Sequence, residues 1–171
     1  KIPYNAQTLH RASSTDSRTW SDFSTVLDAF AANSSKYEGI GFMFSPTDPY
    51  VGIDIDDCLE DGELKPWARE LVDLMQSTYA EVSPSGNGIK MWIKADKTRS
   101  NNRKSIGDGD GGIEIYDKKR YFTVTGKLFG EATTVAENQV GLDQLMQKVW
   151  GDPKPKKKPQ RKPTTMDQDD S

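Results

Sequence analysis

The sequence predicts an α+β domain built around a largely antiparallel sheet. Segments with strand and helix patterns interleave along residues 1–150, and the turns between them are short enough for hairpins. The full length of 171 residues suffices for one domain with an ordinary core. The chain is polar, with 34% hydrophobic and 29% charged residues, but its regularly spaced aromatic and β-branched side chains argue against disorder.

The N-terminal third is predicted to form one helix and two strands after a loop at residues 1–19. Ser21 to Phe30 carries apolar side chains at helical spacing, and Ser21 is placed to cap the first turn. Strands are predicted at residues 39–44 and 50–55. The Ser-Pro-Thr-Asp-Pro turn between them allows the two strands to pair as a hairpin.

The rest of the domain continues the alternation. A second helix is predicted from Pro66, because proline suits a first helical turn and apolar residues through Thr78 give this helix one buried face. The remaining predicted elements are a turn-rich loop at 83–88, a strand at 89–94, a polar loop at 95–112, strands at 113–116 and 121–125, and a helix at 140–149.

The last stretch, residues 151–171, is predicted to be a basic, proline-rich linker or tail beyond the folded core at 1–150. Six basic residues and three prolines stand between Lys154 and Pro163. Proline interrupts helices and like charges keep a chain extended, so we expect a solvated tether that adds salt-screened attraction to phosphates.

Cysteine and histidine usage excludes several classes of function. Cys58 is the only cysteine and His10 the only histidine of the sequence. This excludes a disulfide within the chain, a zinc finger and a Cys/His catalytic pair. Any divalent metal is therefore expected to have oxygen ligands. There is no membrane-length apolar run and no signal peptide pattern, so a cytoplasmic location without a membrane partner is expected.

Two aspartates stand on one face of an apolar strand. Asp54 and Asp56 are two residues apart, which puts their Cα atoms about 6.6–7 Å apart. Two such charges repel, and a pair of Mg²⁺ ions is one arrangement that relieves the repulsion. The alternative is a strand that runs into a solvated acidic loop. Asp57 points the other way and is predicted to be a surface or capping residue.

Glu114 is a third acid in an apolar strand. A carboxylate flanked by isoleucines is costly unless it is paired or bound to metal. Three oxygen ligands from two strands suffice for a hard cation completed by water and phosphate oxygens. The alternative is an exposed edge-strand residue paired with a lysine of the 118–119 turn.

A loop rich in small residues is a candidate phosphate site. The stretch from Ser83 to Gly88 lets backbone amides approach an anion, and Lys90 follows it. Its spacing matches neither a P-loop nor a dinucleotide fingerprint, and a plain turn is the alternative. Basic residues that either add positive charge on this side or form a mixed-charge solvated surface are Arg99, Arg103, Lys104, Lys118, Lys119 and Arg120.

Combined in this order, the motifs resemble those of bifunctional DNA primase–polymerase (PrimPol) domains of the archaeo-eukaryotic primase superfamily, found in phages, plasmids and mobile elements. Each motif alone is common, but the ordered set is specific and covers about residues 1–130. The matching stretches are Pro3-Tyr4-Asn5, Ala12 to Asp16 with Thr19-Trp20, Gly52 to Cys58, Ser83 to Gly88, Gly112 to Tyr116 and Arg120 to Gly126.

This resemblance implies a fold and a set of roles. The fold would be an RRM-like sheet with packed helices and a small N-terminal α/β unit. The activity would be DNA-templated nucleotidyl transfer with two Mg²⁺ or Mn²⁺ ions, nucleoside triphosphates, a single-stranded template with primer, and a C-terminal helicase domain or partner. The implied residues are Asp54, Asp56 and Glu114 for catalysis and metal, and Ser83, Ser85, Gly86, Gly88, Lys90, Arg120, Thr123 and Thr125 for the nucleotide. From their positive charge, the residues expected to contact DNA are Arg99, Arg103, Lys104, Lys118 and Lys119.

The sequence departs from the family pattern at one informative position and leaves two rival functions open. Many members have histidine where this chain has Lys90, and a lysine supplies a point charge in place of an oriented imidazole. A metal-dependent nuclease would use the same acids, although Tyr116 stands where its usual acid-x-lysine signature needs lysine. A non-catalytic RRM-like module would instead display aromatic side chains on the sheet for base stacking.

Overall fold

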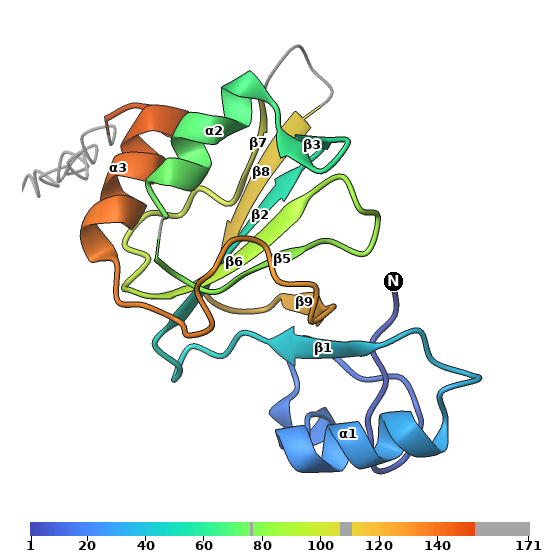
Figure 1. Cartoon of the computed structure of the whole chain (residues 1–171). Coiled ribbons are helices and arrows are strands. Elements are labelled where there is room, and N and C mark those ends of the chain that lie inside the picture. Colours follow the sequence, from blue (N-terminus) through green and yellow to red (C-terminus); the bar gives the residue numbers. More distant parts are fainter. Residues whose placement is uncertain (76, 107–110, 153–171) are drawn as a thin grey trace, which may run out of the picture.

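A five-stranded antiparallel sheet forms the centre of the protein, seen in a computed structural model that describes residues 1–75, 77–106 and 111–152 (Figure 1). The strand order is β5-β6-β2-β8-β7, and β1 pairs separately with β9 in a two-stranded ribbon. The described elements are η1 (Ser17–Thr19), α1 (Phe23–Ala32), β1 (Ile40–Met43), β2 (Tyr50–Asp56), β3 (Leu59–Glu60), β4 (Glu63–Leu64), α2 (Pro66–Asp73), β5 (Ala80–Val82), β6 (Ile89–Lys94), β7 (Arg103–Ile106), β8 (Gly111–Tyr116), β9 (Tyr121–Val124) and α3 (Gln139–Trp150).

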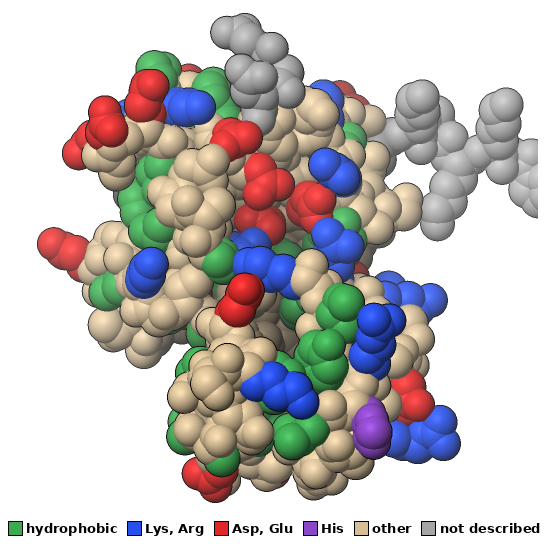
Figure 2. Space-filling view, turned by 90° about the vertical axis from the view of Figure 1, so that its right-hand side faces the viewer, with side chains coloured by type: hydrophobic (Ala, Val, Ile, Leu, Met, Phe, Trp, Pro, Cys, Tyr) green, Lys and Arg blue, Asp and Glu red, His purple; other side chains and the backbone are tan. Residues whose placement is uncertain are grey.

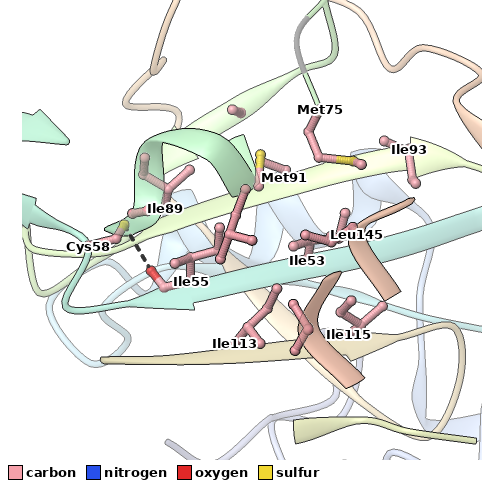
Figure 3. Close-up of a cluster of buried hydrophobic side chains, with 14 of the residues drawn as sticks. Ile53, Ile55, Cys58, Met75, Ile89, Met91, Ile93, Ile113, Ile115 and Leu145 are labelled. Atoms are coloured by element: carbon pink, nitrogen blue, oxygen red, sulfur yellow. Dashed lines mark hydrogen bonds between the residues drawn. The ribbon is translucent and has the colours of Figure 1, made fainter. Parts of the chain in front are cut away.

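The main core lies between one face of this sheet and the helices α2 and α3, which lie together on that side (Figure 1). Strand alternation sends every second side chain of β2, β6 and β8 to the helices. Figure 3 shows several of these buried side chains meeting Leu145 of α3. They are Ile53, Ile55, Ile89, Met91, Ile93, Ile113 and Ile115.

The helices begin at capping residues close to the predicted starts. Pro66 occupies the first turn of α2, as the sequence predicts. The side chain of Asn138 caps α3 by accepting a hydrogen bond from the Gly141 amide at 2.9 Å. For α1 the predicted cap is wrong, because Asp22 and not Ser21 accepts the hydrogen bond from the Thr25 amide. An aspartate caps as well as a serine, so the pattern fixed the start only to within one residue.

The opposite face of the sheet is partly covered by the β1–β9 ribbon. Phe44, Trp92 and Phe122 form a second, smaller core there, which is aromatic. The Phe44 and Phe122 rings meet edge to face with centroids 4.9 Å apart, and the Trp92 and Phe122 centroids are 5.8 Å apart. This cluster covers the Gly52 end of β2 and leaves the Asp56 end open. It therefore decides where a pocket can form.

The hairpin predicted from strands 39–44 and 50–55 is wrong. β1 pairs with β9, whereas β2 pairs with β6 and β8 on its two sides. The apolar β2 is buried on both faces, so it takes the centre of the sheet, and the aromatic β1 packs over the sheet face. The predicted loop at 95–112 contains strand β7, whose Arg-Lys-Ser-Ile sequence is too polar for the strand pattern to reveal.

The predicted α+β class with a mainly antiparallel sheet is confirmed. In the N-terminal part α1 precedes β1, and the strand that pairs with β1 is β9, which comes much later in the sequence. The small N-terminal α/β unit of the primase fold stays a prediction. The tail predicted at 151–171 lies almost wholly outside the described residues. None of the described helices is long and apolar enough to span a membrane.

Candidate active site

Three ionisable side chains meet on neighbouring strands at the open end of the sheet. Asp54 of β2 lies directly opposite Lys90 of β6 and directly opposite Glu114 of β8. Opposed residues of antiparallel strands share one face, so all three project away from the helices. Their exposed fractions are 8%, 8% and 6%. Glu114 is therefore no edge-strand residue, because β8 lies between β2 and β7.

Asp54 is a buried carboxylate with one occupied and one unoccupied oxygen. Its Oδ2 forms an ion pair with the Lys90 ammonium, while its buried Oδ1 has no hydrogen-bond partner among the described residues. Burial raises the pKa of Asp54 above its usual range, the Lys90 charge opposes that rise, and the nearby Asp56 and Glu114 charges add to it. An orphaned buried oxygen among other carboxylates is a feature that a bound cation would satisfy.

Glu114 is held by two arginines. Arg120 donates from Nη2 to Oε2 at 2.9 Å, and the Arg103 Nε lies 3.3 Å from Oε1. The Arg120 guanidinium also stacks over the Tyr116 ring, 4.9 Å from its centroid. Both arginines keep about half or more of their side-chain surface exposed, so they can also meet a ligand from solvent.

Asp56 and Asp57 diverge at the end of β2. Asp56 is exposed and lines the same pocket as Asp54. Asp57 has a left-handed backbone with φ of 50° and accepts a hydrogen bond from the Asn87 side chain. Its contact is thus with the 83–88 loop, in keeping with the local role predicted for it.

Asp54, Asp56, Lys90 and Arg120 border a pocket of about 430 Å³, whereas Glu114 is not among its lining residues. Figure 2 shows acidic and basic side chains gathered in the hollow between the body of the molecule and its smaller N-terminal part. Its lining comes from strands β2, β6 and β9, from the segment that leads into β9 and from the N-terminal residues. The loop at residues 83–88, here called the serine-rich loop, also contributes. The lining residues are Lys1, Ser14, Asp54, Asp56, Ser83, Pro84, Ser85, Lys90, Lys119, Arg120, Tyr121, Phe122 and Thr123.

The serine-rich loop is fastened against the end of β2. Ser83 Oγ accepts a hydrogen bond from the Gly88 amide at 3.1 Å and lies 2.9 Å from Ser85 Oγ. A Cβ atom at Gly88 would come within 2.9 Å of the Ile55 carbonyl oxygen, so only glycine allows this close approach. The two serines line the pocket beside the acids. Gly86 and Gly88 shape the loop and are not among the lining residues.

The predicted basic residues fall into two groups. Lys119 lines the pocket, and Lys118, paired with Asp117 at 3.6 Å, is exposed in the same turn. In contrast, Lys104 donates to the Val149 carbonyl of α3, and Arg99 donates to the Gly151 carbonyl at 2.8 Å. Strand alternation explains the split within β7, because Arg103 faces Glu114 and the next residue faces the helices.

Thr123 and Thr125 also differ in whether they line the pocket. Thr123 lines the pocket, whereas Thr125 Oγ1 donates to the Val82 carbonyl at 2.8 Å. The backbone amide of Thr125 donates to Glu81 at 2.7 Å. Thr125 thus ties the end of β9 to β5, and the structure does not bring it to the pocket with the other predicted nucleotide residues.

Glu81 is the residue that the sequence reasoning missed. It is fully buried on β5, directly opposite Lys90, and its carboxylate accepts four hydrogen bonds. The donors are Tyr79 Oη at 2.5 Å, the Thr125 amide at 2.7 Å, the Gly126 amide at 3.1 Å and, at 3.2 Å, Thr125 Oγ1, whose one proton is shared with the Val82 carbonyl. An acid between Ala80 and Val82 repeats the pattern that singled out Glu114, so that pattern could have found it.

The donor set fits a hard divalent cation. Among the described residues, no three acidic, histidine or cysteine side chains already converge closely enough to hold an ion. The site nevertheless offers the unpartnered Oδ1 of Asp54 and the exposed carboxylate of Asp56 on the same strand face. Oxygen ligands of this kind suit Mg²⁺ and Mn²⁺. These two aspartates could therefore hold such an ion, with Glu114 on the adjacent strand.

Comparison with known proteins gives two matches. Residues 28–144 match the family described as BT4734-like, N-terminal domain. The chain is also 34% identical over 146 residues, 83% of its length, to a protein named DNA Primase-polymerase from Nitratiruptor phage NrS-1. The matched region is 20% of that relative, so this chain spans about a fifth of its length. The chain belongs to the family of BT4734-like N-terminal domains and is related to a phage primase-polymerase.

Proposed function

We propose that this domain is a nucleotidyltransferase that makes or extends DNA primers on a single-stranded template. The observation that carries the proposal is the joint placement of Asp54, Asp56 and Glu114 beside the Lys90 ammonium and the serine-rich loop. Asp54 and Asp56 thus line one pocket with a basic, hydroxyl-rich side for a triphosphate, and Glu114 lies directly opposite Asp54 on the adjacent strand. The relation to a protein named as a primase-polymerase supports this choice among metal-dependent reactions.

In this proposal Asp54 and Asp56 hold two Mg²⁺ or Mn²⁺ ions, with Glu114 as the third acid. Such ions, when bound, would lower the pKa of the attacking hydroxyl and offset the charge of the leaving pyrophosphate. The protein's own part is to hold the carboxylates on one rigid strand face. A central strand bonded on both sides positions them more firmly than a loop would.

The nucleotide is proposed to lie across the pocket from the acids. Ser83 and Ser85 present hydroxyls, and Lys90 and Arg120 present positive charge to phosphate oxygens. Thr123 lies on the same wall. The template and primer would follow the exposed basic turn at Lys118 and Lys119 and the outer side of Arg103. These three side chains would contact the phosphate groups of the nucleic acid.

Two parts of the expected machinery stay outside this pocket. Arg99 and Lys104 are engaged with carbonyl groups at the end of α3, so the proposed DNA path does not use them. The C-terminal helicase domain or partner implied by the resemblance also stays a prediction.

The structure favours this function over the non-catalytic binding module. A base-stacking sheet needs exposed aromatic side chains, but Trp92 is 5% exposed and packs under Phe122 of the ribbon. The aromatic face is thus already covered by the protein itself. No observation specifically favours a nuclease, and the experiment below separates the two reactions.

The decisive experiment supplies a template, with and without primer, deoxy- or ribonucleoside triphosphates, and Mg²⁺ or Mn²⁺, with separate labels on the template, the primer and the nucleotides. We expect longer products for the wild-type chain and none for Asp54→Asn or Glu114→Gln. Lys148→Met is a suitable control, because Lys148 pairs with Glu70 on the helix layer. Shortened template in place of extended primer would establish a nuclease. Binding without either product would support the non-catalytic module.

A further inference from the structure

Lys90 occupies an enclosed position between the acids and the aromatic core. Its side chain is 10% exposed, its ammonium pairs with Asp54 Oδ2, and it lies 4.8 Å from the centroid of the Phe122 ring. On its other side stands Glu81, whose carboxylate already accepts hydrogen bonds from Tyr79, Thr125 and Gly126. Lys90 nevertheless borders the pocket, so its ammonium lies where both a cation and a phosphate would arrive.

The charge balance of this arrangement is local. A buried carboxylate or ammonium is costly alone, and each of these two ions compensates the other. The Phe122 ring adds an attractive face for the ammonium. Glu114 has its own arginines, whereas Asp54 has Lys90. In the state described here, Lys90 therefore supplies the positive charge that a divalent ion would otherwise give to Asp54.

We infer that Lys90 is an exchangeable internal counter-ion, which leaves Asp54 when a divalent cation binds there and then binds the triphosphate, so that metal and nucleotide binding are coupled. This inference rests on the proposed function. Its physical basis is competition, because a divalent cation on Asp54 would repel the Lys90 ammonium and take over the carboxylate charge that holds it there. The flexible four-carbon stem of lysine permits the movement.

The coupling has a clear sign. Without nucleotide, Lys90 must be displaced before a cation gains full access to Asp54, which weakens metal binding. With both ligands present, the displaced ammonium finds a new partner in the phosphates, so each ligand favours the other. Removal of the ammonium should then tighten metal binding while it weakens nucleotide binding. A residue that only contacts phosphate would affect the nucleotide alone.

The test measures Mn²⁺ binding directly, by the loss of the free-ion signal in electron paramagnetic resonance, with no nucleotide present. We expect Lys90→Met to bind Mn²⁺ about tenfold more tightly than the wild type, a typical coupling magnitude. Lys148→Met removes the same charge from the helix layer, so its Mn²⁺ affinity should equal that of the wild type. Lys90→Arg keeps the charge and should not bind more tightly than the wild type.

Thermal melting with and without Mn²⁺ is a second measurement, which remains informative if Lys90→Met is less stable than the wild type. Mn²⁺ should raise the melting temperature of Lys90→Met more than that of the wild type, because the ion replaces the missing charge. If Lys90→Met does not fold without metal, Lys90→Gln, whose amide can still donate to Asp54, takes its place. In either neutral variant, a fluorescent triphosphate analogue at saturating Mn²⁺ should bind more weakly than in the wild type.

The outcomes separate this inference from the proposed function. Equal or weaker Mn²⁺ binding by Lys90→Met and Lys90→Gln, with wild-type binding that depends on Asp54, would overturn the counter-ion role and leave the proposed metal site intact. If Asp54→Asn binds Mn²⁺ as tightly as the wild type, the metal site itself is refuted. Tighter metal binding together with weaker triphosphate binding in the neutral variants is the result that supports the inference.

Discussion

Gly52 lies directly beneath the ring of Phe44, and a Cβ atom at Gly52 would come within 2.1 Å of the Phe44 Cζ atom and 2.5 Å of Phe122 Cε2. This contact seats the β1–β9 ribbon on the central strand two residues before Asp54. The absence of a side chain at Gly52 therefore sets how closely the pocket wall approaches the acids.

Gly52→Ala should destabilise the fold, because the rings cannot move away without disturbing the aromatic core. Overpacking of this kind typically costs about 1–3 kcal/mol. Gly112→Ala is the control, since among the described residues a Cβ there meets only the Lys104 carbonyl oxygen, at an ordinary 3.6 Å. Urea unfolding of both variants measures the difference. Equal stability of the two would show that the ribbon is not seated by Gly52.

Asp54 and Lys90 should depend on each other for stability. Loss of one member of a buried ion pair typically costs about 3–5 kcal/mol, because the other is left uncompensated. Asp54→Asn and Lys90→Met should each lower the free energy of unfolding, and the double variant should lower it by less than the sum. A double-mutant cycle from urea unfolding gives the coupling energy. Strict additivity would mean that the pair contributes nothing to the fold.

Glu81→Gln should loosen the end of β9. An amide has one acceptor oxygen, so it cannot receive all four hydrogen bonds, and a lost bond to a charged group costs about 1.5–3 kcal/mol. We expect a lower melting temperature and, because Arg120 directly precedes β9 and Thr123 lies within it, a higher KM for the nucleotide. Glu63→Gln on the exposed β4 is the control. A melting temperature unchanged from the wild type would show that the Glu81 hydrogen bonds do not stabilise the end of β9.

Lys119 and Lys104 should differ in what they support. Lys119→Ala should weaken binding of single-stranded DNA and reduce the slope of log K against log salt by about 0.7, the value for one phosphate contact. Lys104→Ala should leave that slope unchanged and lower stability instead, because its ammonium binds the Val149 carbonyl. Fluorescence anisotropy at several salt concentrations, with thermal melting, distinguishes them. The reverse pattern would place the DNA on the helix side.

The Cys58 thiol should make stability depend on alkaline pH. It is fully buried, donates to the Ile55 carbonyl at 3.2 Å, and burial raises its pKa from 9.0 to about 12. Because the folded thiol keeps its proton to a higher pH than the unfolded thiol, this stabilising contribution is complete below pH 9 and is lost as the pH rises toward 12.

Comparison with Cys58→Ala isolates this effect from tyrosine ionisation. The stability advantage of the wild type over the variant should shrink by about 1.4 kcal/mol for each pH unit above 9. Urea unfolding at pH 8, 9, 10 and 11 measures it. A constant advantage across this range would show that the thiol ionises equally in the folded and unfolded chain.

The sequence alone determined the α+β class, most element positions and the strand that carries Asp54 and Asp56, because these follow from local periodicity. The alternation of isoleucine with acid along β2 assigns one face to the core and the other to the pocket before any partner strand is known. The rule that an acid in an apolar strand needs compensation singled out Glu114 in the same way.

Only the tertiary structure decided which strands are neighbours and which charges pair. The β1–β9 pairing joins segments that are distant in sequence, and their match depends on packing over the sheet face, which no local pattern encodes. The sequence predicted Lys90 as a phosphate ligand, whereas the register of β6 against β2 places it on Asp54. Charge compensation acts through space between strands that are distant in sequence, so the counter-ion emerges only when the sheet is assembled.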